Sequence, residues 1–322
     1  MAATNPLTVQ RLLESRSETL ALELLNPGSD VQRTIGDPTV SNPGLVLAGF
    51  RQRFPEGRVQ VLGETEVLYL RSLDADDRAR VLKTFFALDM PAVVVTKGQD
   101  VPPEVLREAS ARGVPLLRSR LKTGDFYRGI HPFLEEQFAP STTIHGSLAD
   151  VYGVGLLFVG RSGIGKSECV LDLVERGHRL VADDVVQIAR RGHDILIGRG
   201  HEFQQHHMEI RGIGIIDVKA LFGIRAIRQQ KRVEVVVQLV DWDDGATYDR
   251  TGLETEEVDI LDVRIPKVVV PLNAGKNITV ICEVVAMNHL LKYAGVNSAR
   301  LFNDRLRAAM QPVREYLAED YE

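Results

Sequence analysis

The feature that most restricts the possible folds of this chain is the segment Gly160-Arg161-Ser162-Gly163-Ile164-Gly165-Lys166-Ser167, which matches G-x-x-x-x-G-K-[ST] in full. It follows the apolar run Val154–Val159 and opens a helical pattern over Ser167–Glu175. The glycines let successive backbone N–H groups curl into one concavity, and the helix N-terminus adds the positive end of its dipole. Lys166 supplies a cation for the outer phosphates, and Ser167 can bind Mg²⁺ through its hydroxyl. A chance match in a glycine-rich turn would lack the flanking strand and helix, so the segment predicts a nucleotide or polyphosphate site.

Two carboxylates end a second apolar strand. The run Arg179–Ala182 leads directly into Asp183 and Asp184. A strand in this position commonly lies in the same sheet as the phosphate loop, so its end faces the phosphates. One carboxylate can then hold Mg²⁺, and the other can accept a proton from an attacking hydroxyl. The alternative is a solvated turn or a helix cap.

The first portion of the chain alternates helical and strand patterns. Helices are predicted from the Thr8 cap to Ser17, near Asp76–Phe86 and over Pro103–Ala111, and strands at Leu45–Leu47, Val59–Leu62, Ala92–Val95 and Val114–Leu117. This alternation is typical of an α/β sandwich. No combination of residues in this portion indicates catalysis, so its role stays open.

A helix over Thr123–Phe138, disturbed in its middle by Pro132, leads to a break at Pro140–Thr143. We therefore place a domain boundary near residue 135, which gives domains 1–135 and 136–322. Beyond Asp184, strands are predicted at Val185–Ala189, Ile195–Ile197, Val233–Asp241, Val263–Val270 and Asn277–Val285, before a last helix capped by Asn297 or Ser298. The expected fold is α/β, with an N-terminal sandwich and a C-terminal phosphate-loop domain rich in β-strands.

Composition indicates a soluble globular chain without a nucleic-acid partner. The 322 residues suit two domains, and 39 Lys and Arg against 44 Asp and Glu leave no basic excess to neutralise a phosphate backbone. Cys169 and Cys282 lie in apolar runs without metal-type spacing, so we expect buried thiols in a reducing compartment. The sequence shows neither a signal-peptide pattern nor an apolar run long enough for a membrane span, so the cytoplasm is the expected location.

The order of motifs in the second part resembles the HPr kinase/phosphorylase family. Thr142-Thr143-Ile144-His145-Gly146 precedes the phosphate loop, the Asp183-Asp184 strand follows it, and three later stretches fit with compatible spacing: Met208-Glu209-Ile210-Arg211-Gly212-Ile213-Gly214-Ile215-Ile216-Asp217, Tyr248-Asp249-Arg250 and Pro271–Lys276. The resemblance is much weaker in the first part. It implies a kinase domain similar to phosphoenolpyruvate carboxykinase, a homohexamer, and a reaction with Mg²⁺ and ATP. The implied substrate is a serine of HPr, a small phosphocarrier protein of the sugar phosphotransferase system.

The resemblance also implies roles for single residues. Asp184 matches the base that removes the serine proton and the acid that returns it in the reverse direction. Ser167 and Glu209 match the Mg²⁺ positions. The other active-site positions are matched by Lys166, His145 and Arg250. In the reverse reaction inorganic phosphate attacks the phosphoserine and releases pyrophosphate, so pyrophosphate is an alternative donor.

Three of these residues have plain alternatives when they are taken alone. His145 is then more typical of a packing or capping residue. Arg250 fits a solvated charged loop, and Glu209 fits a surface position before a strand. Their functional interpretation depends on the motifs around them.

The stretch Pro271-Leu272-Asn273-Ala274-Gly275-Lys276 lies where the family resemblance implies a role in dephosphorylation. The commoner pattern has a second proline before the glycine and an arginine after it, whereas this chain has Ala274 and Lys276. Lys276 keeps the positive charge but lacks the two-pronged guanidinium, so phosphate contacts there are expected to be weaker or differently aimed. The replacement of the commoner proline and arginine is therefore expected to affect the phosphorylase activity more than the kinase activity.

Two rival functions stay open at this point. The first is a kinase of a small metabolite, which predicts a closed pocket where a protein substrate predicts an open approach to the loop. The second is a regulator that binds ATP without turning it over, and the acidic pair argues against it because a sensor needs no proton acceptor. The group His201, Glu202, His206 and His207 fits no standard zinc spacing, and we interpret it as a loop beside the nucleotide site.

Overall fold

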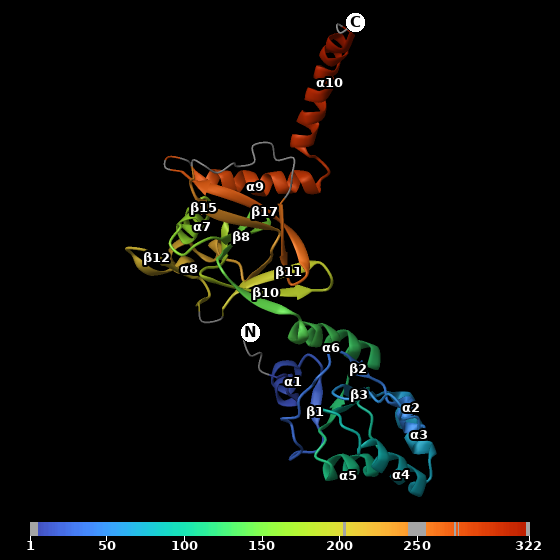
Figure 1. Cartoon of the computed structure of the whole chain (residues 1–322). Helices are drawn as coiled ribbons and strands as arrows, with labels where there is room; N and C mark the ends of the chain where they lie inside the picture. Colours follow the sequence, from blue (N-terminus) through green and yellow to red (C-terminus); the bar gives the residue numbers. More distant parts are fainter. Residues whose placement is uncertain (1–5, 202–203, 244–255, 274, 276, 320–322) are drawn as a thin grey trace. The chain divides into compact units, whose positions relative to one another are not determined.

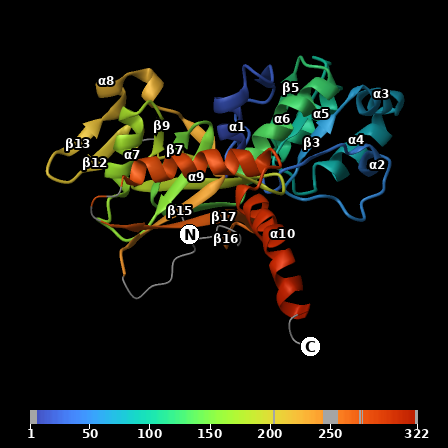
Figure 2. The same cartoon turned by 90° about the horizontal axis from the view of Figure 1, so that it is seen from above.

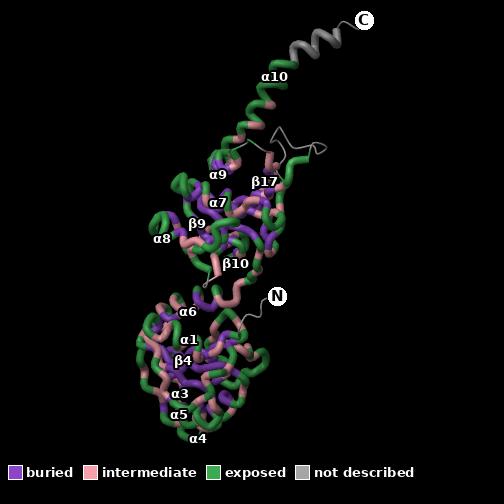
Figure 3. Tube along the Cα trace, turned by 90° about the vertical axis from the view of Figure 1, so that its left-hand side faces the viewer, coloured by how far each residue is buried: buried purple, intermediate pink, exposed green. Residues whose placement is uncertain are grey.

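The structure is a computed structural model that describes residues 6–201, 204–243, 256–273, 275 and 277–319. The chain divides into two compact units between Ala139 and Pro140 (Figure 1). Each unit has its own clusters of buried apolar residues, which gather on the central strands in Figure 3. The boundary predicted near residue 135 falls in the last turn of α6 (Thr123–Phe138).

The first unit is built on one sheet. Its strands are β1 (Leu22–Leu24), β2 (Val40–Ser41), β3 (Val59–Leu62), β4 (Val93–Val95) and β5 (Leu116–Ser119). They form a five-stranded sheet in the order β1-β5-β4-β3-β2, in which only the edge strand β1 pairs antiparallel. Besides α6, its helices are α1 (Val9–Arg16), α2 (Gly44–Leu47), α3 (Glu64–Ser72), α4 (Ala75–Phe85) and α5 (Pro103–Ala111).

Helices cover both faces of this sheet because its buried strands are apolar on both sides. Successive residues of a strand point to opposite faces. Val61 accordingly packs in the cluster of α1 and α6, while Leu62 packs in the cluster of α2, α3, α4 and α5. The mixed α/β organisation expected for this unit is confirmed.

The apolar run Leu45–Leu47, predicted as a strand, belongs to the short helix α2 instead. Pro43 is the N-cap of this helix, and Leu45 is 72% exposed. Leu47 is buried in the core cluster of this unit, so the apolar run packs as one face of a helix and not as a strand. The prediction of a long helix over Thr123–Phe138 is confirmed, because α6 continues through Pro132.

The second unit is richer in strands. Its strands are β6 (Ser141–His145), β7 (Ser147–Val151), β8 (Val154–Val159), β9 (Arg179–Ala182), β10 (Val185–Arg191), β11 (Ile195–Gly200), β12 (His207–Ile210), β13 (Gly214–Asp217), β14 (Gln230–Arg232), β15 (Val235–Asp241), β16 (Glu256–Ile260) and β17 (Val263–Leu272). Its helices are α7 (Lys166–Glu175), α8 (Val218–Phe222), the 3₁₀ helix η2 (Ile224–Ala226), α9 (Ile278–Tyr293) and α10 (Ser298–Glu319).

These strands form two packed sheets and one hairpin. A six-stranded sheet has the order β16-β17-β15-β8-β7-β9, a four-stranded sheet has the order β14-β11-β10-β6, and β12 pairs with β13. On one face of the larger sheet, Leu156 and Val237 pack with α7 and α9 (Figures 1 and 2). On the other face, Leu157 packs with Val186 and Ile188 of the smaller sheet. The larger sheet is therefore the buried middle layer of this unit.

One sequence prediction for the second unit is wrong. Asn277–Val285, predicted as a strand, is the N-cap and first half of α9, and Asn277 Oδ1 accepts a hydrogen bond from Val280 N (3.1 Å). The β-branched run after Asn277 resembles a strand, but the asparagine cap starts a helix there. The predicted break at Pro140–Thr143 coincides with the division between the two units. The chain then enters the strand β6, whose polar residues are tolerated because β6 is an edge strand with alternate residues exposed.

Glu283 on α9 ties this helix to the end of α7. Its buried carboxylate accepts hydrogen bonds from Arg176 Nε (2.9 Å) and Nη2 (2.7 Å) and lies 3.0 Å from His178 Nε2. These partners, Arg176 above all, lower the pKa of Glu283 from 4.5 to about 2. A lowered pKa means that the carboxylate stabilises the fold fully above its ordinary pKa, and that this contribution is lost as the pH falls towards 2.

Replacing Glu283 by glutamine is expected to lower the free energy of unfolding at pH 7 by about 1–2 kcal/mol, less than for a fully buried ion pair because Arg176 is partly exposed. Urea denaturation of wild type and variant over a pH series measures the difference, which should shrink as the medium becomes acidic. Glu175→Gln, a change of an exposed carboxylate on α7, is the matched control. A difference that stays constant with pH would show that the charge of Glu283 is not what stabilises the contact.

Candidate active site

The phosphate loop joins β8 to α7. Gly160, Gly163 and Gly165 have φ angles of 150°, 75° and 104°, which residues with a Cβ rarely adopt. A Cβ on Gly160 would also lie 2.6 Å from the Leu239 carbonyl oxygen. These positions therefore require glycine, and the loop stands between a strand and a helix as the motif demands.

The candidate active-site segments lie at one edge of the larger sheet because the strands that carry them run in the same direction. β8, β15 and β17 are parallel, and Asp241 at the end of β15 pairs with Leu272 at the end of β17. β9 runs the same way as β8, since both are antiparallel to β7, so it delivers Asp183 and Asp184 to this edge. Ligands of α/β sheets bind outside the carboxyl ends of the strands. The phosphate loop, the acidic pair and the start of the stretch Pro271–Lys276 thus share the edge where a ligand is expected.

Both cations of the loop are held by nearby acceptors. Lys166 Nζ donates to the carbonyl oxygens of Gly160 and Arg161, at 3.1 Å each. Arg161 forms a two-pronged ion pair with Asp241, with Nε–Oδ2 and Nη2–Oδ1 distances of 2.6 and 2.7 Å. The hydrogen bond from Arg161 is the main cause that lowers the pKa of Asp241. Lys166 therefore lies across the loop, and Arg161 is tied to the end of a neighbouring strand.

Asp183 is the acidic residue that contacts the loop directly. Its Oδ1 accepts hydrogen bonds from Ser147 Oγ (2.5 Å) and Ser167 Oγ (3.0 Å). The side chain is buried, and its Oδ2 has no hydrogen-bond partner among the described residues. Burial raises the pKa of Asp183, against the two serine hydrogen bonds, which lower it. An unpartnered carboxylate oxygen beside a serine hydroxyl is a donor set that suits a hard cation.

Asp184 stands outside this buried contact, next to His145. Its side chain is exposed, and its φ of 62° is uncommon for a residue other than glycine. The Asp184 carbonyl oxygen accepts a hydrogen bond from Gly146 N (3.0 Å), and His145 pairs with Val185 in the β6–β10 ladder. The fold therefore brings His145 and Asp184 together at the exposed rim of the edge where Asp183 meets the loop.

Glu209 lies on the hairpin of β12 and β13, exposed and opposite Ile215. The Arg211 guanidinium from the same hairpin lies against Gly163, where any Cβ would collide with it. This contact brings the hairpin to the phosphate loop. In the described part of the chain no hydrogen bond links Glu209 with Ser167, so the two predicted Mg²⁺ ligands are near the same loop without direct contact.

Some predicted site residues cannot be placed. Arg250, Ala274 and Lys276 lie outside the described residues. Of the other residues in the stretch, Pro271 and Leu272 end β17, Asn273 is half-buried and Gly275 is exposed with a φ of 86°. The assigned roles of all these residues stay predictions.

Three residues of this edge were not singled out from the sequence. Ser147 holds Asp183, Asp241 holds Arg161, and Arg211 lies on Gly163. Ser147 directly follows the motif that ends in His145-Gly146, and Arg211 lies inside a quoted motif, so both had a local signal. Asp241 had none, because only the parallel pairing of β15 and β8 brings it to the loop.

Comparison with known families decides what this chain is related to. A family model described as "HPr Serine kinase C-terminal domain" matches residues 136–306, and one described as "HPr Serine kinase N terminus" matches residues 7–134. The chain belongs to the HPr kinase/phosphorylase family. The resemblance inferred from the motifs of the second part is thereby confirmed, and the relationship extends over the first part.

Individual relatives agree with the family models. An HPr kinase/phosphorylase of Chloroherpeton thalassium is 45% identical over 328 residues, which cover 98% of this chain and 96% of the relative. One of Geobacter sulfurreducens is 45% identical over 305 residues, which cover 95% and 96%. A solved structure of the Hpr(Ser) kinase/phosphatase from Coxiella burnetii has 34% identity and a TM-score of 0.45, and the match covers 50% of this chain and 98% of that one.

No group of three or more His, Cys, Asp or Glu residues with metal-binding geometry occurs among the described residues, and Glu202 of the histidine-rich loop lies outside them. None of the helices in the described part of the chain has the length and apolar content that crossing a bilayer requires.

Proposed function

We propose that this member of the HPr kinase/phosphorylase family transfers a phosphoryl group from ATP, or from pyrophosphate, to a serine of HPr. We propose further that it reverses the transfer with inorganic phosphate. The observation that supports this most is the hydrogen bond of 3.0 Å from Ser167 Oγ to Asp183 Oδ1. That bond joins the end of the acidic strand to the phosphate loop, so a proton acceptor and a phosphate cradle share one site.

In the forward direction, Asp184 accepts the proton of the seryl hydroxyl as its oxygen bonds to the transferred phosphorus. Its exposure and its place at the strand end leave it accessible to a serine carried by another protein. The backbone N–H groups of the loop and Lys166 stabilise the phosphates, and we assign Arg250 to the same role. Positioning and charge neutralisation account for most of the catalysis of phosphoryl transfer.

The residues of this edge fit Mg²⁺. The Ser167 hydroxyl donates a hydrogen bond to Asp183, which leaves the lone pairs of Ser167 Oγ free for a cation. The unpartnered Oδ2 of buried Asp183 is a second hard donor, and Glu209 on the neighbouring hairpin is the third candidate. When bound, Mg²⁺ would neutralise charge on the phosphates and orient them. Asp183 fixes the orientation of the Ser167 side chain because it accepts the hydrogen bond from the Ser167 hydroxyl.

In the reverse direction, an oxygen of inorganic phosphate attacks the phosphorus of phosphoserine, the bond from phosphorus to the serine oxygen breaks, and pyrophosphate is released. Asp184 then returns the proton to the serine oxygen, because a group that removes a proton in one direction must supply it in the other. The stretch Pro271–Lys276 is proposed to contact the attacking phosphate or the phosphoserine. Its second residue, Leu272, pairs with Asp241 at the loop edge.

The open character of the site favours a protein substrate over a small metabolite. His145, Asp184 and Glu209 are all exposed. A metabolite kinase would enclose its substrate to exclude water, whereas a serine on a protein surface needs an open face.

The domain roles and the assembly complete the proposal. Residues 136–322 are proposed as the catalytic domain, similar in architecture to phosphoenolpyruvate carboxykinase, and residues 1–135 as a domain of open role. A cytoplasmic homohexamer is the proposed assembly. Its support on this chain is the exposed apolar face of α9, where Val284, Met287 and Leu291 are 55%, 43% and 46% exposed. Such a face is commonly covered by another chain.

The proposed function predicts that the purified chain with Mg²⁺ and γ-labelled ATP transfers the label to HPr. An HPr variant whose acceptor serine is replaced by alanine should stay unlabelled. Unlabelled phosphoserine-HPr with inorganic phosphate should yield pyrophosphate. ATP binding without any transfer would favour the regulator, and label recovered in a metabolite would favour the metabolite kinase, so either result would overturn the proposal.

A further inference from the structure

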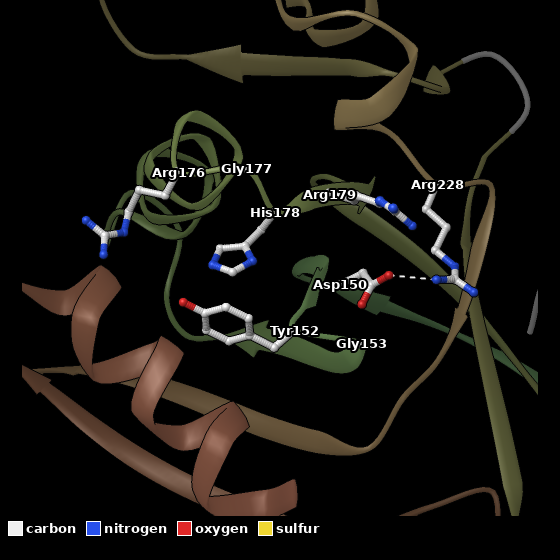
Figure 4. Close-up of a pocket in the computed structure, with 8 residues that line it drawn as sticks. All are labelled: Asp150, Tyr152, Gly153, Arg176, Gly177, His178, Arg179 and Arg228. Atoms are coloured by element: carbon white, nitrogen blue, oxygen red, sulfur yellow. Dashed lines mark hydrogen bonds and ion pairs between the residues drawn. The ribbon is translucent and has the colours of Figure 1, made fainter.

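A second polar pocket lies at the opposite end of α7 from the phosphate loop (Figure 4). It has a volume of about 380 Å³, and its lining includes Asp150, Tyr152, Arg176, His178, Arg179 and Arg228. Lys166 is the first residue of α7, and Arg176 is its C-cap. A helix rises 1.5 Å per residue, so about 15 Å of helix separates the loop from this pocket. The two sites are therefore distinct.

The backbone fixes an arginine pair beside one aspartate in this pocket. Asp150 of β7 pairs with Arg179 of β9, and Arg228 N donates to the Leu180 carbonyl oxygen (2.8 Å), so three adjacent segments carry the three side chains. Figure 4 shows Asp150, Arg179 and Arg228 gathered on one side, with Arg176 on the other. Arg176 is already neutralised by Glu283. The charge available to bind a ligand in this pocket therefore lies in the cluster of Asp150, Arg179 and Arg228.

The charges of this cluster are not balanced. Arg228 Nη1 donates to Asp150 Oδ2 (2.7 Å), while the guanidinium group of Arg179 makes no hydrogen bond or ion pair with any residue that the structure describes. Two guanidinium groups thus face one carboxylate, which leaves one positive charge in excess. Guanidinium groups in such a pair bind tetrahedral oxyanions through parallel N–H bonds.

Asp150 requires that a ligand of this pocket also donate a hydrogen bond, which an anion without a proton cannot do. The residue is 5% exposed, and its Oδ1 has no hydrogen-bond partner in the described part of the chain. A buried carboxylate oxygen without a partner is unfavourable, and only a donor can satisfy it. A ligand that satisfies this cluster therefore carries a hydrogen-bond donor, such as an O–H group, beside its negative oxygens.

We propose that this pocket binds a phosphate group that carries or adjoins an O–H, with its charged oxygens on Arg179 and Arg228 and its O–H donated to Asp150 Oδ1. Inorganic phosphate meets this description, because it keeps at least one proton at neutral pH. A small phosphate monoester with a neighbouring hydroxyl meets it as well. Sulfate does not, since it has no proton and would set a negative oxygen against the carboxylate. The rings of Tyr152 and His178 lie between this cluster and Arg176. They pack edge to face, with their centroids 4.6 Å apart.

Calorimetric titration of the full chain with inorganic phosphate, sulfate and glycerol phosphate tests this site. Phosphate should bind to wild type and to Lys166→Ala, which disables the phosphate loop. Arg179→Ala should lower the affinity at least about tenfold, the usual scale for a charge-assisted hydrogen bond. The matched control Arg225→Ala removes another exposed arginine that lies outside the lining, and it should leave the phosphate affinity unchanged.

Selectivity supplies the sharper test. Sulfate should bind wild type at least about tenfold more weakly than phosphate, and Asp150→Asn should narrow this gap because the amide can donate to sulfate. Binding of glycerol phosphate as tight as that of phosphate would identify monoesters as ligands, and weaker binding would identify free phosphate; both support the site. Loss of all phosphate binding in Lys166→Ala, equal effects of Arg179→Ala and Arg225→Ala, or equal affinities of wild type for sulfate and phosphate would each overturn the proposal.

Discussion

Replacing Asp184 by asparagine is expected to slow phosphorylation and dephosphorylation of HPr together, each by about two to four orders of magnitude. Asparagine keeps the size of the side chain but can neither take nor return a proton. The exposed position of Asp184 beside His145 means that the change removes no buried contact. Transfer of label from ATP to HPr and release of pyrophosphate from phosphoserine-HPr measure the two directions, while nucleotide affinity should stay unchanged.

Asp194→Asn is the matched control for this experiment. Asp194 is an exposed carboxylate in the turn between β10 and β11, so its replacement removes the same charge away from the loop. Both rates should then stay at the wild-type level. If Asp184→Asn abolished one direction and spared the other, a single residue could not be both base and acid, and the proposed mechanism would be wrong.

Replacing Asp183 by asparagine is expected to lower activity by about 100-fold, the scale for losing a residue that orients a metal ligand. It is also expected to raise the thermal stability. Activity falls because Ser167 loses the carboxylate that accepts its hydrogen bond. Stability rises because burial disfavours the charged form of Asp183 and raises its pKa. With a raised pKa, stability is greatest below the ordinary carboxyl range and is lost as the pH rises through the folded-state value. Asparagine is neutral throughout and avoids that loss.

Three measurements check this prediction. The Mg²⁺ concentration for half-maximal activity should increase in the variant. Its unfolding midpoint at neutral pH should exceed that of wild type, and the two midpoints should converge on acidification. A variant that is less stable than wild type at neutral pH would mean that the hydrogen bonds from Ser147 and Ser167 outweigh the cost of burying the charge.

Much of the fold followed from local patterns in the sequence. The helix bounds Pro103–Ala111 and Thr123–Phe138 and the strand bounds Val154–Val159 and Arg179–Ala182 are confirmed residue for residue. Three of these segments have strong local signals, namely the proline at the start of Pro103–Ala111 and the short apolar run of each strand. The phosphate loop was equally visible because its chemistry depends on contiguous residues.

Other features depend on contacts that no local pattern contains. The β-branched start of α9 favours a strand until Asn277 is recognised as a cap. The bond from Ser147 to Asp183 joins residues of β7 and the end of β9, and it exists only because these strands pair. The sequence indicated two carboxylates near the loop, but it did not predict that Asp183 is buried on Ser167 while Asp184 stays exposed. That difference depends on the turn between β9 and β10.

The two cysteines offer a direct view of motion in the helix layer behind the phosphate loop. Cys169 of α7 and Cys282 of α9 are buried with their Sγ atoms 4.0 Å apart, and this contact, followed by burial, raises the pKa of Cys282. Alkylating reagents react with accessible thiolates. While α7 and α9 are packed together, neither thiol is accessible. The sequence contains no other cysteine. The alkylation rate of the native protein therefore reports how often α7 and α9 separate, because no other thiol can react.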